Sequence, residues 1–273
     1  MSASTTTTYD FPHIDDVRHP FMQTARDTWL IFHRSLWLTI RQPVWIIFGM
    51  MLPLLYLFLF GPLLEGATQA AGTTTNAFNW FVPGLIIQIA IFGTAFGGFG
   101  LIAELRSGVI ERMRVTPMSR TAMLLGRSLR DIVILQVQAL ILIVLAVPLG
   151  LKIDPVGIPV VMGLLVLIGL VSAPLSYAAA LTLKSEDAFA PLVNSVAMPL
   201  LLLSGILLPM ALAPAWLQFL STINPLTHTV DAARALFNGQ FGSPEIPIGV
   251  GVTAVLAVIS VWLAARTFSR ANA

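Results

Sequence analysis

The chain has 273 residues, of which 56% are hydrophobic and 10% charged, and it contains no cysteine. Soluble proteins carry about 25% charged residues, so this composition excludes an ordinary soluble domain and predicts long apolar segments. The lack of cysteine excludes disulfides, thiolate metal sites and thiol nucleophiles. The formal net charge is only +2, and we expect no nucleic-acid partner.

Residues 1–19 are polar and rich in threonine, with acidic side chains at Asp10, Asp15 and Asp16. A secretory signal needs an apolar core, which this segment lacks. The composition therefore predicts a disordered cytoplasmic tail.

Residues 20–41 follow with an amphipathic helical pattern. One face is apolar and contains Met22, Ala25, Trp29, Phe32, Leu36 and Ile40. Asp27, Arg34 and Arg41 lie on the other side, and Ile31 breaks the pattern. We expect a helix that lies on the cytoplasmic leaflet and leads into the membrane; a helix packed on a soluble partner is the alternative.

Charge-free windows of about 18 residues or more then predict six transmembrane helices within residues 42–266. The windows give spans at about residues 44–63, 80–103, 132–151, 158–183, 191–212 and 246–265. Residues 267–273 form a short cytoplasmic tail. The fold class predicted is an all-α integral membrane protein.

The basic residues determine the orientation of these spans. With the N-terminus inside, 13 of the 15 Lys and Arg residues are cytoplasmic, and only Lys152 and Arg234 lie outside. The opposite topology would export the 13 positive charges, against the positive-inside rule. We therefore expect both termini in the cytoplasm of a multi-pass protein of the plasma membrane.

The cytoplasmic stretch 104–131 is longer than a simple connector needs to be. Its basic side chains are Arg106, Arg112, Arg114, Arg120, Arg127 and Arg130, and its apolar ones include Val109, Ile110, Met113 and Val115. This mixture favours a short helix that docks on a partner. A positive-inside loop that pairs only with lipid headgroups is the alternative.

Two further connections carry candidate contact residues. The turn after the fourth span contains Lys184, Glu186 and Asp187, which form either a second cytoplasmic contact or only a turn. Outside, residues 213–245 predict two short helices that dip into the outer leaflet or lie on it, separated by Asn224 and Pro225. Asp231 and Arg234 are three residues apart on one helical face and are expected to pair.

Several chemistries are absent from the sequence. There is no G-x-x-x-x-G-K-[ST] loop for ATP, and the four histidines have no metal-ligand spacing. No Asp, Glu, Lys or Arg lies in the middle of a predicted span, which argues against coupling to an ion gradient. A substrate pathway would then be lined by amides and hydroxyls, and its candidates are Gln88, Thr94, Asn194, Ser195 and Ser204. Such a lining suits amphipathic or apolar cargo.

A series of motifs, taken in their order along the chain, resembles the type-2 ABC transporter permease family. The likeness is strongest to its drug and antibiotic export branch, with daunorubicin-resistance-like membrane subunits. The motifs are Val82-Pro83-Gly84, Glu104-x-x-x-Gly108-x-x-Glu111-Arg112-x-x-x-Thr116-Pro117-x-x-Arg120, Gly126-Arg127-x-x-x-Asp131, Asn224-Pro225 and Asp231-x-x-Arg234-x-x-x-x-Gly239. The resemblance covers nearly the whole chain from about Phe21.

The resemblance implies a permease that dimerises, as a homodimer or a heterodimer, with two copies of a separate ATP-binding subunit. It implies that residues 104–116 are a coupling helix on that ATPase, with contacts from Glu104, Arg106, Gly108, Glu111, Arg112, Arg114, Thr116, Pro117 and Arg120. Residues 20–41 would be the interfacial helix, and the segment after the fifth span would form extracellular re-entrant helices. The first and fifth spans would face the other protomer across the substrate path.

By the same resemblance the chain has no enzymatic site of its own, and ATP and Mg²⁺ bind the partner subunit. The expected function is export of amphipathic or hydrophobic small molecules from a bacterial cell. Export of a lipid-linked glycan or cell-wall polysaccharide is the alternative within this class. A channel or membrane scaffold is a weaker alternative, because rings of pore-lining charge are missing.

Overall fold

The computed structural model describes residues 20–70, 76–108, 120–207 and 210–270. All regular structure in these ranges is helical, and six of the helices are long and apolar enough to cross a membrane. The expected all-α fold with six spans is therefore confirmed. The elements are α1 Pro20–Ile40, α2 Pro43–Ala70, α3 Ala77–Ala95, α4 Gly98–Arg106, α6 Arg120–Ala146, α7 Gly157–Leu183, α8 Glu186–Leu203, α9 Ala215–Ile223, α10 Pro225–Phe237 and α11 Glu245–Arg270, with 3₁₀ turns at Val147–Leu149 and Met210–Leu212.

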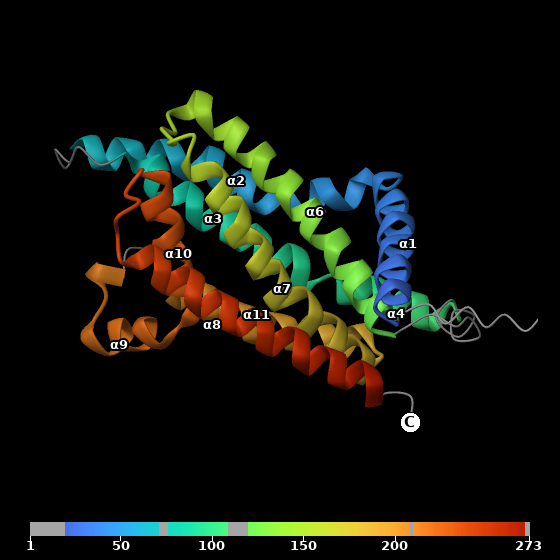
Figure 1. The fold of residues 1–273 in the computed structure, drawn as a ribbon. Helices are drawn as coiled ribbons and strands as arrows, with labels where there is room; N and C mark the ends of the chain where they lie inside the picture. Colours follow the sequence, from blue (N-terminus) through green and yellow to red (C-terminus); the bar gives the residue numbers. More distant parts are fainter. Residues whose placement is uncertain (1–19, 71–75, 109–119, 208–209, 271–273) are drawn as a thin grey trace, which may run out of the picture.

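The spans form an elongated bundle with α3 near its centre (Figure 1). Helix α3 contacts α2, α6, α7 and α10, and every residue from Phe81 to Ile91 is buried. Helix α7 packs along α11 and α6. Burial of these apolar side chains holds the helices of the bundle together within the chain.

The two ends of the bundle differ (Figure 1). Helix α1, α4 and the start of α6 lie at one end, and α9 and α10 lie at the other. We call them the inner and outer ends, because the distribution of arginines predicts the first to be cytoplasmic. The last turns of α11 also lie at the inner end.

Helix α1 packs against α6, and its packing corrects the pattern expected from the sequence. Ile31, which breaks the apolar face, is buried at 4% exposure together with Phe32. Met22, Trp29 and Ile40 are all more than half exposed. Helix α1 therefore has two apolar faces, because one contacts α6 and the other is left for lipid or another chain.

The second span is broken, although a single helix over 80–103 was expected. Helix α3 ends at Ala95 and α4 begins at Gly98. Ser176 of α7 satisfies the backbone at the break: its hydroxyl donates to the carbonyl of Ala95 and accepts from the N–H of Gly98 at 2.9 Å. A side chain from a distant segment replaces hydrogen bonds that a continuous helix would make, which a local pattern does not reveal.

The ends of two other spans also differ from the apolar windows. Helix α2 continues to Ala70, and α8 covers Glu186–Leu203 where the window was 191–212. After α8, Gly205 adopts a left-handed backbone with φ of 72°, which ends the helix. The two short helices expected between the fifth and sixth spans are present as α9 and α10.

Candidate functional site

A cluster of charged side chains is buried at the inner end of the bundle. The guanidinium of Arg127 on α6 contacts the carboxylate of Glu104 on α4. The Arg127 side chain is only 5% exposed. A buried charge is stable only when it is paired and hydrogen-bonded, so this pair fixes the end of α4 against α6.

Arg130 and Asp131 form the second part of the cluster. Arg130 contacts the Asp131 carboxylate at 3.0 Å and donates to the hydroxyls of Thr39 and Tyr177, each at 3.0 Å. The hydroxyl of Tyr177 donates in turn to Asp131. One side chain of α6 thereby contacts both α1 and α7.

The cluster connects α1, α4, α6 and α7 at the inner end. Its residues Arg127, Arg130 and Asp131 lie in the cytoplasmic stretch before the third span, in the part where Ser119 was expected to begin a helix leading into that span, and they belong to the helix α6. The search for charge-free windows left these residues out of the third span, because it treats every charged side chain as exposed. Their spacing of three and four residues was the available signal, since it places Arg127 on the same helical face as the other two.

The expected coupling segment is described only at its two borders. Glu104 and Arg106 form the last turn of α4, Gly108 follows with a φ of 69°, and Arg120 opens α6. The remaining candidates lie outside the described residues, namely Glu111, Arg112, Arg114, Thr116 and Pro117. Their contact with an ATPase stays a prediction.

The second expected cytoplasmic contact lies beside the first. Lys184 adopts a left-handed backbone between α7 and α8, and Glu186 and Asp187 open α8. Arg106 of α4 pairs with Glu186 at 3.3 Å, with both side chains substantially exposed. The fold thus places the two candidate contact segments next to each other on the inner surface.

The candidate pathway residues separate into two groups. Asn194 and Ser195 are exposed on α8, where Asn194 donates to the carbonyl of Ala190 at 3.0 Å. Gln88, Thr94 and Ser204 are buried inside the chain. Thr94 donates to Ser172 of α7 at 2.7 Å, and Ser204 donates to the carbonyl of Leu201, also at 2.7 Å. Only the α8 group faces a surface where a substrate or another chain could reach it.

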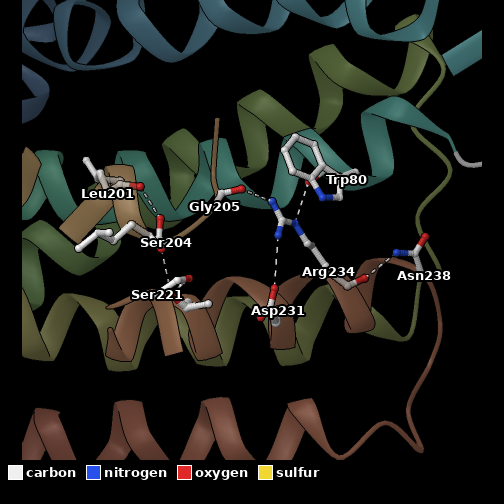
Figure 2. Close-up of polar contacts among 10 residues, drawn as sticks. Trp80, Leu201, Ser204, Gly205, Ser221, Asp231, Arg234 and Asn238 are labelled. Atoms are coloured by element: carbon white, nitrogen blue, oxygen red, sulfur yellow. Dashed lines mark hydrogen bonds and ion pairs between the residues drawn. The ribbon is translucent and has the colours of Figure 1, made fainter. Parts of the chain in front are cut away.

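The outer end is organised around Arg234 of α10 (Figure 2). Its guanidinium donates to the carbonyl of Gly205 at 2.7 Å, to the carbonyl of Trp80 at 3.1 Å and to Asp231 at 3.3 Å, and it lies 4.3 Å from the Trp80 ring centroid. The expected Asp231–Arg234 pair is therefore confirmed. The sequence did not reveal the two carbonyl contacts, which join α10 to α3 and to the end of α8.

A small cavity of about 250 Å³ lies beside this arginine, lined by Trp80, Ser204, Gly205, Met210, Thr227, Asp231 and Arg234. Burial raises the pKa of Asp231, and the adjacent Arg234 guanidinium opposes that rise. Burial likewise lowers the pKa of Arg234. The ion pair is therefore partly withdrawn from water, so its hydrogen bonds matter more than those of an exposed pair.

The sequence was compared with known protein families and proteins. Residues 26–238 match the model of the ABC-2 type transporter family. A daunorubicin resistance ABC transporter permease protein, DrrB1 of Streptomyces coeruleorubidus, is 29% identical over 82% of this chain and 79% of its own length.

Two other relatives share most of the chain. A protein of Cyanophora paradoxa that carries the name transport permease ycf38 is 30% identical over 71% of this chain and 68% of its own. A protein of Mycobacterium tuberculosis that is named as a doxorubicin resistance ABC transporter permease, DrrC, is 23% identical over 80% of each chain. The residues matched by the family model, 26–238, include α8, α10 and both borders of the coupling segment.

Proposed function

The chain belongs to the ABC-2 type transporter family and is a multi-pass transport permease, and from this premise we propose that it is the membrane subunit of an ATP-driven exporter. Its cargo would be amphipathic or hydrophobic small molecules, and a separate subunit would hydrolyse ATP. The drug-resistance names of two relatives support this substrate class.

The observation that carries the proposal is the surface of α8. Of the six spans, α8 and α2 are buried least, with 22% of each window covered. Helix α8 exposes the polar residues Asn194 and Ser195 among the apolar side chains of Leu192, Val196 and Met198. Exposed amides and hydroxyls within a span are unfavourable against lipid tails, so this face suits a path for amphipathic molecules.

A second permease copy would complete that path. Helix α2 also presents a long apolar face, with exposed side chains that include Ile47, Phe48, Met51, Leu55, Phe58, Leu59 and Leu63. We propose that α2 and α8 face the other protomer and that the substrate moves between them. The identity of the second copy, either the same chain or a related one, decides between homodimer and heterodimer.

The ATP-binding subunit would dock at the inner end, with ATP and Mg²⁺ bound on that subunit. The borders of the coupling segment support this proposal, because Arg106 and Glu186 bring α4 and the start of α8 together on an exposed surface. The buried cluster behind them gives the docking surface a rigid base. Both termini of the chain would lie in the cytoplasm of a bacterial cell.

Transport by inside-out vesicles tests the proposal. Vesicles that contain the chain and its ATP-binding partner should take up fluorescent amphipathic dyes when ATP is added, and vesicles without the partner should not. Equal uptake with and without ATP would refute the proposal. Stimulation of ATP hydrolysis by lipid-linked glycans, but not by dyes, would instead favour the glycan alternative.

A further inference from the structure

The outer end of α8 is capped by side chains of another segment. The last carbonyls of a helix lack intrahelical partners and must find other donors. Asn224 donates to the carbonyl of Leu200 at 2.7 Å, and Thr227 donates to that of Leu203 at 3.3 Å. Arg234 adds its 2.7 Å bond to the carbonyl of Gly205 (Figure 2). All three donors come from the α10 segment.

Helix α10 itself is firmly held by the rest of the bundle. Its residues Val230, Ala233 and Leu236 are buried, and Thr229 bonds to Thr253 of α11 at 2.8 Å. Helix α10 packs mainly on α11, α3 and α7 and makes few contacts with α8 beyond the capping bonds. The capping bonds therefore join a well-anchored helix to a poorly packed one.

The last turn of α8 is bordered on both sides by interruptions of the regular helix backbone. Pro199 lies inside α8, directly before this turn. Proline has no N–H, so the carbonyl of Ser195 four residues earlier loses its helical partner, and proline rings kink helices at this point. On the other side, Gly205 gives the chain a left-handed bend with φ of 72°. Residues 200–204 thus lie between a missing helical hydrogen bond and a glycine bend.

We propose that Asn224, Thr227 and Arg234 form a latch that holds the last turn of α8 closed, and that this turn has a second, released position reached by a hinge at Pro199. Side-chain donors can exchange for water without unfolding α10, so release costs the capping bonds and the withdrawal of Leu201, which is 7% exposed, from the core. Release of this turn would open the outer end of the α8 face. The link to opening rests on the proposed export function, whereas the two positions of the turn do not.

Distance measurements between spin labels test the latch directly. The chain has no cysteine, so labels attach only where cysteine is introduced. Leu202→Cys on the turn and Ile248→Cys on α11 replace side chains that are 59% and 50% exposed. The labelled chain is diluted with unlabelled chain in lipid nanodiscs so that distances within one chain dominate.

With the latch intact, one distance should dominate. Thr227→Val removes the bond to Leu203 on the turn, and also the 3.2 Å bond to Ser221, which does not involve the turn. Loss of the first bond should raise the released population about fivefold, and Arg234→Lys, which loses a charge-assisted bond, about tenfold or more. Adding Pro199→Ala to Arg234→Lys should lower that population again, because the helix regains a hydrogen bond across the hinge.

Thr182→Val is the matched control. Thr182 bonds only within its own helix, to the carbonyls of Ala178 and Ala179, so its loss should leave the label distance unchanged. The melting temperature shows whether each variant is folded, and Thr227→Val changes too little to prevent folding. Unchanged distances in folded Thr227→Val and Arg234→Lys would overturn the latch. Loss of ATP-dependent transport alone would bear on the proposed function instead.

Discussion

The hydroxyl of Tyr177 on α7 donates to the carboxylate of Asp131 on α6, and both side chains are buried where α3 ends and α4 begins. This contact joins two spans at the inner end, in the cluster that also includes Glu104 at one border of the coupling segment. If the proposed ATPase docks at the inner end and shifts α6, this bond would pass the shift to α7.

Replacing Tyr177 with Phe should destabilise the protein by about 1–3 kcal/mol, because Asp131 and Arg130 each lose a buried hydrogen-bond partner. The melting temperature in detergent measures this effect. Tyr56→Phe on α2 is the control for the same chemical change, since Tyr56 lies on a sparsely packed helix and contacts Phe60 edge to face. Equal melting of the Tyr177→Phe variant and the unmodified protein would show that the bond contributes nothing.

Gly97→Ala should also destabilise the protein, by about 1–3 kcal/mol of overpacking. A methyl group at this position would lie 2.8 Å from the Asp131 carboxylate and 3.2 Å from the Tyr177 hydroxyl. Gly100→Ala is the matched control, because no described atom outside its own helix backbone and chain neighbours lies within 4 Å of its methyl group. That variant should be neutral or stabilised by roughly 0.5–1 kcal/mol through helix propensity. If Gly97→Ala melted at the same temperature as Gly100→Ala, the close packing at Gly97 would be contradicted.

Arg106 and Glu186 should matter more for activity than for stability. Their side chains are 55% and 42% exposed, and exposed ion pairs contribute less than about 1 kcal/mol. Arg106→Glu should therefore leave melting nearly unchanged while lowering transport-coupled ATP hydrolysis severalfold. The double variant Arg106→Glu/Glu186→Arg should regain most of the coupling. Failure of the double variant to recover would show that the pair does not join α4 to α8 during transport.

Replacement of Glu111 or Arg112 by Ala should uncouple ATP hydrolysis from transport without unfolding the spans. The proposed coupling segment contains both residues. ATP hydrolysis and dye uptake are measured on the same vesicles, with Lys152→Gln in the outer loop as a control for loss of one charge. Normal uptake in both Ala variants would rule out their role in coupling.

Asn194→Leu should lower export of amphipathic dyes at least severalfold if the α8 face lines the path. The substitution keeps the size of the side chain but removes the amide. Val258→Leu on α11, at a position that is 71% exposed, should not change export because α11 is not one of the two helices proposed to line the path. Full export by Asn194→Leu would place the path elsewhere.

The six spans and the two outer helices α9 and α10 could be predicted from the sequence. Long apolar windows and the proline or glycine residues that end a helix can be recognised within a short stretch of sequence. The buried cluster could not be predicted, since Arg127 and Asp131 are charged and were expected on the cytoplasmic surface. Their burial depends on Glu104 and Tyr177, which are distant in the sequence. The break before Gly98 likewise depends on Ser176 of another helix.

At the outer end, sequence spacing predicted the Asp231–Arg234 pair but not the bond to Gly205. That bond depends on where α8 ends, and the apolar window continues past Leu203 without a visible stop. Helix ends set by a single glycine backbone are difficult to predict from composition. The latch could therefore not be predicted from the sequence, although Arg234 itself was identified.

Purification of the tagged chain from its native membrane in mild detergent tests the central claim most directly. The account predicts that a second chain with a G-x-x-x-x-G-K-[ST] loop purifies with it in equal amounts and that the complex hydrolyses ATP. A folded chain that purifies without any nucleotide-binding subunit, and that still transports dye in vesicles without ATP, would contradict it.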